Sequence, residues 1–134
     1  MLTAFLACDD PCDTADFLVA RPGWQLAFAT PRQSDDKLAC VALGDAEVML
    51  GTADERYLPE RSRGHKGAGV TIYIRLPPAE DIAGIHARHA AAGVVSAPLS
   101  PRPWGELAFD AVIAGYRFLI PQEPGQDPLH GTAD

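Results

Sequence analysis

Residues 103–118, PWGELAFDAVIAGYRF, place a tryptophan between proline and glycine and follow it with two strand-like runs. The first run, 106–113, is rich in apolar residues and alternates as a strand does. The second begins at residue 116, directly after Ala114-Gly115, a pair typical of a tight turn. This stretch predicts a hairpin whose incoming loop carries an aromatic side chain, Trp104.

An earlier stretch of the chain follows the same plan. Residues 37–51, KLACVALGDAEVMLG, also contain two strand-like runs joined across a glycine. Sliding the chain by 68 residues brings Thr3 onto Thr71 and Phe5 onto Tyr73, and the offset grows by one or two residues toward the end of each half. The agreement in residues and in order indicates an internal duplication.

Each half contains a strand, a helix and three further strands. The predicted strands are 3–9, 23–30, 37–44 and 46–51, then 69–76, 94–99, 106–113 and 116–121, and the predicted helices are 11–20 and 78–93. The pattern predicts an α+β fold of two βαβββ modules in tandem, with a curved mixed sheet around a cavity and helices on the outer faces. The expected boundaries within a single domain are module 1 at about 1–52, a linker at 53–67, module 2 at about 68–122 and a loose tail at 123–134.

Composition narrows the range of partners. The formal net charge is −7, from 18 acidic and 11 basic residues, which disfavours nucleic acids and anionic membranes and favours a cationic small molecule. No apolar run is long enough to span a bilayer, and the N-terminus does not read as a signal peptide, so we expect a soluble cytoplasmic protein. Three cysteines without paired spacing predict reduced thiols and no structural zinc site.

Several motifs together carry a family resemblance: TAFLACDD at 3–10, LGDAEVMLG at 43–51, AAAGV at 90–94, and PWGELAF leading to GYRFLI. In this duplicated order they resemble the vicinal oxygen chelate superfamily over residues 3–122. That superfamily includes glyoxalase I, extradiol dioxygenases, fosfomycin-modifying enzymes and resistance proteins that sequester bleomycin or mitomycin. In the sequestering members two chains associate, and the ligand lies in a groove lined by aromatic residues from both.

The resemblance also implies where a metal would bind. Its enzymes hold a divalent ion through His, Gln or Glu on the first and last strands of each module, and the matching positions here are Thr3, Met49, Thr71 and Leu119. None of these side chains offers an imidazole or a carboxylate, so we expect neither a metal nor another cofactor. His86 and His89 are three residues apart, and we expect them on the outer surface of their helix, far from the cavity.

Strand alternation turns Phe5, Tyr73 and Arg75 toward the cavity. Tyr57 and Trp104 lie in loop sequence, where flat rings can stack on a planar ligand. Trp24 is expected to serve in packing or in a dimer contact. The predicted ligand-binding set, with core packing as the alternative for its aromatic members, is Phe5, Phe28, Glu47, Met49, Tyr57, Tyr73, Arg75, Trp104, Phe109 and Arg117.

Three hypotheses about function remain open. The first is a homodimeric, non-catalytic protein that sequesters a small cationic, planar aromatic or amphipathic molecule such as an antibiotic. The second is a metal-dependent lyase, isomerase or oxygenase of the glyoxalase or dioxygenase type. The third is a metal-free accessory enzyme of a biosynthetic pathway that uses the cavity as a reaction chamber.

Overall fold

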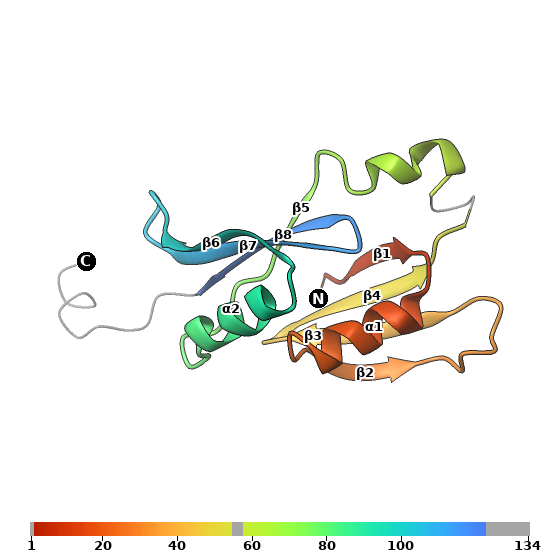
Figure 1. Cartoon of the computed structure of the whole chain (residues 1–134), viewed down its shortest axis with the longest axis horizontal. Helices are drawn as coiled ribbons and strands as arrows, with labels where there is room; N and C mark the ends of the chain where they lie inside the picture. Colours follow the sequence, from red (N-terminus) through yellow and green to blue (C-terminus); the bar gives the residue numbers. More distant parts are fainter. Residues whose placement is uncertain (1, 55–57, 123–134) are drawn as a thin grey trace.

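The computed structural model describes residues 2–54 and 58–122 and contains two modules with the same order of elements (Figure 1). The first module comprises β1 (Ala4–Cys8), α1 (Pro11–Ala20), β2 (Gln25–Ala29), β3 (Leu38–Leu43) and β4 (Ala46–Thr52). A 3-10 helix, η1 (Glu60–His65), lies in the predicted linker. The second module comprises β5 (Thr71–Tyr73), α2 (Ile82–Ala91), β6 (Val95–Pro101), β7 (Leu107–Ile113) and β8 (Tyr116–Gln122). The predicted tandem α+β architecture is confirmed, and the predicted tail lies outside the described residues.

Each module has a sheet of its own. The strand orders are β1-β4-β3-β2 and β5-β8-β7-β6, and in each sheet the first strand pairs in parallel with the last strand of its module while the other pairs are antiparallel. The expected curved sheet is therefore a pair of four-stranded mixed sheets. The two lie next to one another, with α1 over the first sheet (Figure 1).

Local capping explains where the helices begin. Asp10 accepts hydrogen bonds from the backbone N–H groups of Cys12 and Asp13 at 3.0 and 3.1 Å, and Pro11 occupies the first helical position, as predicted. The second helix begins at Ile82, four residues later than predicted. Asp81 caps it by accepting from the N–H of Gly84 at 3.1 Å, and so the residues before Asp81 stay outside the helix.

The strand β5 is shorter than the predicted run 69–76, but the chain keeps its path along β8 beyond Tyr73. The N–H of Ile74 donates to the carbonyl of Leu119 at 2.9 Å, and the N–H of Leu76 donates to the carbonyl of Pro121 at 2.7 Å. Residues 74–76 therefore stay in register with the sheet, which fixes the side on which Arg75 lies.

The two modules share one core, and Trp24 lies where they meet. Its ring is 2% exposed, it donates from Nε1 to His89 Nε2 at 2.9 Å, and it packs edge-on against Phe118 with ring centroids 6.0 Å apart. The expectation that His89 lies on the outer surface is wrong, because α2 turns this side chain inward, where it is fully buried. Of the two expected roles of Trp24, the structure shows packing.

Further contacts tie the modules together on the same side of the sheets. Tyr116 donates its hydroxyl hydrogen to the carbonyl of Ala7 at 2.8 Å, and Arg88 Nε donates to the carbonyl of Pro22 at 3.1 Å. The helix-covered faces therefore supply the core. We call the opposite side of each sheet its open face.

Candidate ligand-binding site

The open face of the first sheet carries a row of four residues in register. Phe5 pairs with Met49, Met49 with Cys40, and Cys40 with Phe28, so all four side chains are on one face. The phenylalanines at the ends of the row are each 46% exposed. A Cβ atom at Gly51 would overlap the Phe5 ring, so this glycine leaves room for the ring to lie over the strand. A pocket of about 300 Å³ opens beside it.

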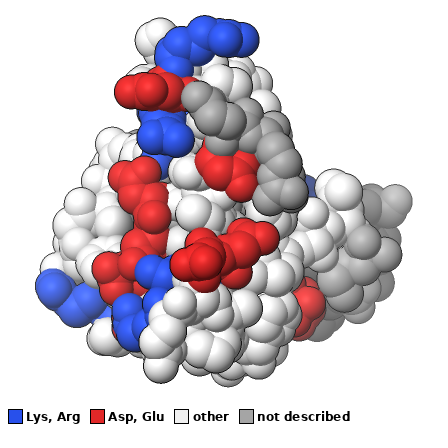
Figure 2. Space-filling model, turned by 90° about the vertical axis from the view of Figure 1, so that its right-hand side faces the viewer, with Lys and Arg blue, Asp and Glu red and all other residues white. Residues whose placement is uncertain are grey.

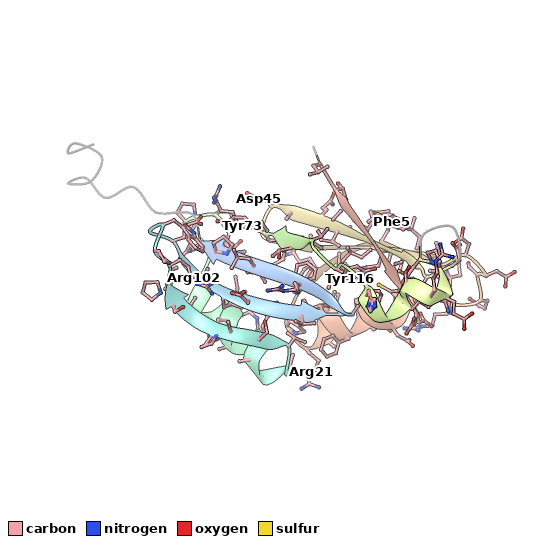
Figure 3. All side chains as sticks on the ribbon, turned by 90° about the horizontal axis from the view of Figure 1, so that it is seen from above. Phe5, Arg21, Asp45, Tyr73, Arg102 and Tyr116 are labelled. Carbon is pink, nitrogen blue, oxygen red and sulfur yellow. The ribbon has the colours of Figure 1, made fainter. Side chains whose placement is uncertain are left out.

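The second sheet repeats this row with more polar residues. Tyr73 pairs with Leu119 and Leu119 with Asp110, while in the neighbouring row Thr71 pairs with Arg117. They line a pocket of about 310 Å³, which also includes Arg102 and Trp104 from the loop between β6 and β7. Figure 3 shows Tyr73 and Arg102 at the same end of this sheet. We call this site the second-module pocket.

A buried carboxylate organises the rim of the second-module pocket. Glu106 is 6% exposed and accepts hydrogen bonds from Trp104 Nε1 at 2.7 Å, from Arg75 Nε at 2.9 Å and from the Tyr73 hydroxyl. The Arg75 guanidinium also lies 5.2 Å from the centre of the Tyr73 ring. Trp104 is nevertheless 57% exposed, so its indole is held at one edge while much of its surface remains free.

The hydrogen bonds of this cluster determine its protonation. The pKa of Glu106 is lowered chiefly by the hydrogen bond from Tyr73, then by Arg75 and Trp104, against the opposing effect of burial. The pKa of Tyr73 is raised, first by burial and then by its hydrogen bond to the carboxylate. At neutral pH the cluster thus consists of an ionised Glu106, a cationic Arg75 and a neutral Tyr73.

Two arginines border the pocket, and their surroundings differ. Arg102 Nη2 donates to Asp110 Oδ1 at 2.7 Å and to the carbonyl of Ala108 at 3.1 Å, so its charge is paired. Arg117 is exposed and has no ion-pair or hydrogen-bond partner among the residues that the structure describes. The pocket therefore presents one paired and one unpaired guanidinium.

Most of the predicted ligand-binding residues lie on the two open faces, but not all of them do. Phe109 is completely buried on the helix-covered face, where its ring centre lies 5.2 Å from that of His86 and 5.3 Å from that of His89. Its predicted place on the cavity side is wrong, because the large apolar ring of the alternating pair Phe109-Asp110 enters the core and the carboxylate turns outward. Glu47 borders a separate groove of about 410 Å³ between the modules, and Tyr57 lies outside the described residues.

Five polar residues of the site were absent from the predicted set: Thr71, Ser96, Arg102, Glu106 and Asp110. Glu106 follows Trp104 by two residues, and Gly105, at a φ of +98°, makes the turn that lets the two side chains meet. The sequence contained a usable signal for Asp110, since a charged residue in an otherwise apolar strand marks the face that is not in the core.

The positions at which the resemblance implies metal ligands do not fit a metal here. Thr71, Met49 and Leu119 lie on the open faces, and their donor atoms are at most a hydroxyl or a thioether. Within residues 2–54 and 58–122, no group of three His, Cys, Asp or Glu side chains could hold a metal ion. Over the same residues, no helix has the length and apolar character needed to cross a membrane.

Solved structures of other proteins share this architecture. TioX from Micromonospora sp. ML1 matches with a TM-score of 0.69 and 22% identity, over 95% of this chain and 98% of that one. The bleomycin resistance determinant encoded on the transposon Tn5 matches with a TM-score of 0.67 and 17% identity, over 93% and 98%. The fosfomycin resistance protein FosX from Listeria monocytogenes, solved with Mn(II) and 1S,2S-dihydroxypropylphosphonic acid, matches with a TM-score of 0.64 and 16% identity, over 92% of each chain.

The chain therefore shares the fold of these structures, which is the vicinal oxygen chelate fold. The predicted resemblance is confirmed at the level of fold. No protein-family profile and no curated protein matches the sequence. The structural neighbours include both a bleomycin resistance determinant and a fosfomycin resistance protein solved with Mn(II), so the fold alone does not select one of the three hypotheses about function.

Proposed function

We propose that the chain is a non-catalytic binding protein for a small planar aromatic or amphipathic molecule, with the second-module pocket as its site. The observation that carries this proposal is the geometry of Trp104. Its indole N–H is fixed by the buried carboxylate of Glu106, while 57% of the residue remains exposed beside a pocket. A tryptophan placed in this way is a stacking surface that needs little further ordering when a ligand binds.

The size of the pocket limits the ligand. A volume of about 310 Å³ is at the lower end of the roughly 300–1,000 Å³ range of small-molecule sites. A fused pair of rings fits this space, whereas a larger drug needs additional surface. That surface is available on the open face of the first sheet, which presents Phe5 and Phe28.

We assign that additional surface to a second copy of this chain, as the resemblance to the sequestering proteins predicts. Four large apolar residues between 42% and 46% exposed lie on the open faces of the two sheets: Phe5, Phe28, Tyr73 and Val112. Exposed apolar residues gathered in this way are typical of interaction surfaces. In the dimer, the first sheet of one copy faces the second-module pocket of the other.

Thermal unfolding with a panel of planar aromatic compounds tests the binding function. A compound at 100 times its Kd stabilises the protein by about 2.7 kcal/mol through mass action alone. We expect at least one compound to raise the unfolding temperature of the wild type and of the Val19→Ala variant, whose substitution is on α1, away from the pocket. The same compound should have little effect on Trp104→Ala. A panel without any stabilising compound would contradict the proposal.

A further inference from the structure

The net charge of the side chains that line the second-module pocket is positive, whereas the net charge of the whole chain is negative. The lining contains two arginines and one aspartate, Arg102, Arg117 and Asp110, which leaves an excess of one positive charge. Arg102 and Asp110 form an ion pair at 2.7 Å, so they largely cancel one another. The uncompensated charge is that of Arg117.

Hydroxyl donors accompany this arginine. Thr71 is the registered neighbour of Arg117 across the parallel pair β5 and β8, so both side chains rise from the same face. Ser96, from β6, contributes another hydroxyl to the pocket. A guanidinium beside hydroxyl donors is suited to a carboxylate, which accepts two N–H bonds from an arginine.

The aromatic surface stands within the same pocket as this donor group. Tyr73 extends from β5 two residues after Thr71, and Trp104 faces the pocket from the loop between β6 and β7. A ligand can therefore place a ring against the aromatic side chains while an acidic substituent reaches Arg117. The two contacts require both groups on one small molecule.

The net charge of −7 does not oppose this arrangement at close range. Acidic side chains gather across the middle of the face in Figure 2, which is the right-hand side of Figure 1, whereas the loop with Arg102 and Trp104 lies at the left of Figure 1. The screening length at physiological salt is about 8 Å, so charges at the far end of the molecule act weakly on a bound ligand. The unpaired Arg117 has the larger influence because it lines the pocket itself.

We infer that the second-module pocket selects planar aromatic molecules that carry a carboxylate or a comparable anionic group, with Arg117 as the residue that determines this selectivity. The inference rests on the proposed binding function. It departs from the cationic ligand that the net charge predicts, and it makes Arg117, together with Thr71, the anion-binding part of the site.

The test compares two probes of one shape, 2-naphthoate and 2-naphthamide, by isothermal titration calorimetry. We expect the wild type to bind the acid roughly tenfold more tightly than the amide, as a charge-assisted contact provides. The Arg117→Gln variant should bind both with similar affinity, and Arg117→Lys should recover part of the preference. Arg63→Gln removes the same charge from η1, outside the pocket, and should keep the preference of the wild type.

The outcomes separate the two proposals. Equal affinity of the wild type for acid and amide contradicts the selectivity and leaves the binding function standing. A preference for the acid that persists in Arg117→Gln also contradicts it, because another residue would then hold the anion. Failure of both probes to bind up to their solubility limits contradicts the binding function itself, and the selectivity falls with it. Circular dichroism of each variant confirms that it is folded.

Discussion

At the scale of single residues, Glu106 connects the stability of the molecule to its candidate function. It is a buried carboxylate that accepts from three side chains belonging to β5, the segment after it and the β6–β7 loop. A buried charge requires such partners, since an unpaired one would be strongly destabilising. One of those partners is Trp104, so the interactions that satisfy the carboxylate also fix the orientation of the exposed indole.

The two tryptophans should respond to substitution in opposite ways. Trp104→Ala removes a half-exposed ring, so we expect ligand affinity to fall more than the free energy of unfolding does, because Tyr73 and Arg75 still donate to Glu106. Trp24→Phe leaves the pocket intact but takes away the hydrogen bond to His89, which should lower the free energy of unfolding by about 1–3 kcal/mol. Urea denaturation and calorimetric titration of both variants measure the two effects. A Trp104→Ala protein that binds the ligand with the affinity of the wild type would contradict the proposal that Trp104 stacks on the ligand.

At the scale of elements, the hairpin between β7 and β8 contains a local conflict. Its turn residues Ala114 and Gly115 have φ angles of +53° and +86°, as in the two-residue turns that suit a twisted hairpin. Glycine adopts this conformation readily, whereas alanine has its Cβ close to a carbonyl oxygen. Ala114 is the one non-glycine residue with positive φ in the described part of the chain.

Replacing Ala114 by asparagine should stabilise the protein. Asparagine tolerates the left-handed region better than alanine, so we expect a gain of about 1 kcal/mol in the free energy of unfolding, measured by urea denaturation. The matched control is Ala68→Asn, at an exposed residue without a positive φ, which should change little. A destabilised Ala114→Asn protein would show that packing of this side chain outweighs its backbone conformation.

The bounds of the two helices and the face of β7 were predicted from the sequence with different success. The bounds of α1 were predicted correctly because its capping residues, Asp10 and Pro11, adjoin the helix in the chain. The start of α2 was placed four residues too early, because the residue that caps the helix is Asp81 and the chain before it is not helical. In β7 the face of Phe109 was assigned wrongly, because a shift of one residue inverts the whole strand.

The site was predictable only in part for a similar reason. Phe5, Tyr73, Arg75 and Trp104 could be found from alternation and from loop position. The link from Glu106 to Tyr73 spans 33 residues along the chain, and it depends on how the β6–β7 loop folds back over β5. No local pattern encodes that contact, so the link between Glu106 and the first strand of the second module became visible only in the folded structure.

At the scale of the whole molecule, the modules are held together through a neutral histidine. Trp24 Nε1 can only donate, so His89 Nε2 must be unprotonated, and Nδ1 donates to the carbonyl of Ile85 at 2.7 Å. The pKa of His89 is lowered, mainly by burial, while the neighbouring Arg88 and His86 lower it further. Protonation of His89 would place its Nε2–H group against the Nε1–H group of Trp24 in the shared core.

Stability should therefore fall on the acid side of neutrality. His89 titrates at its ordinary value of 6.5 in the unfolded chain and at a lower pH in the folded one, so its stabilising effect is complete above 6.5 and is lost as pH falls toward the folded pKa. Between these two pKa values, the free energy of unfolding should change with pH by up to about 1.4 kcal/mol per pH unit for one proton. Urea denaturation from pH 7.5 to 5 measures it. The slope should be weaker in His89→Gln and unchanged in His65→Gln, and identical slopes in all three would contradict this assignment.

Assembly is a second property of the whole molecule. If a second copy covers the open faces, light scattering after gel filtration should give twice the mass of one chain. Phe28→Asp places a charge on the open face of the first sheet and should yield monomers, whereas Val19→Asp, at a residue 39% exposed on α1, should stay dimeric. A wild-type protein that elutes as a monomer at all concentrations would contradict the dimer.

The location of the ligand is the central claim, and chemical-shift mapping tests it most directly. In ¹⁵N-labelled protein titrated with 2-naphthoate, we predict that the largest saturable shifts occur at residues 71–75, 102–106 and 110–119, around the second-module pocket. Shifts that are largest on α1 or η1, or the lack of any saturable shift, would contradict the account.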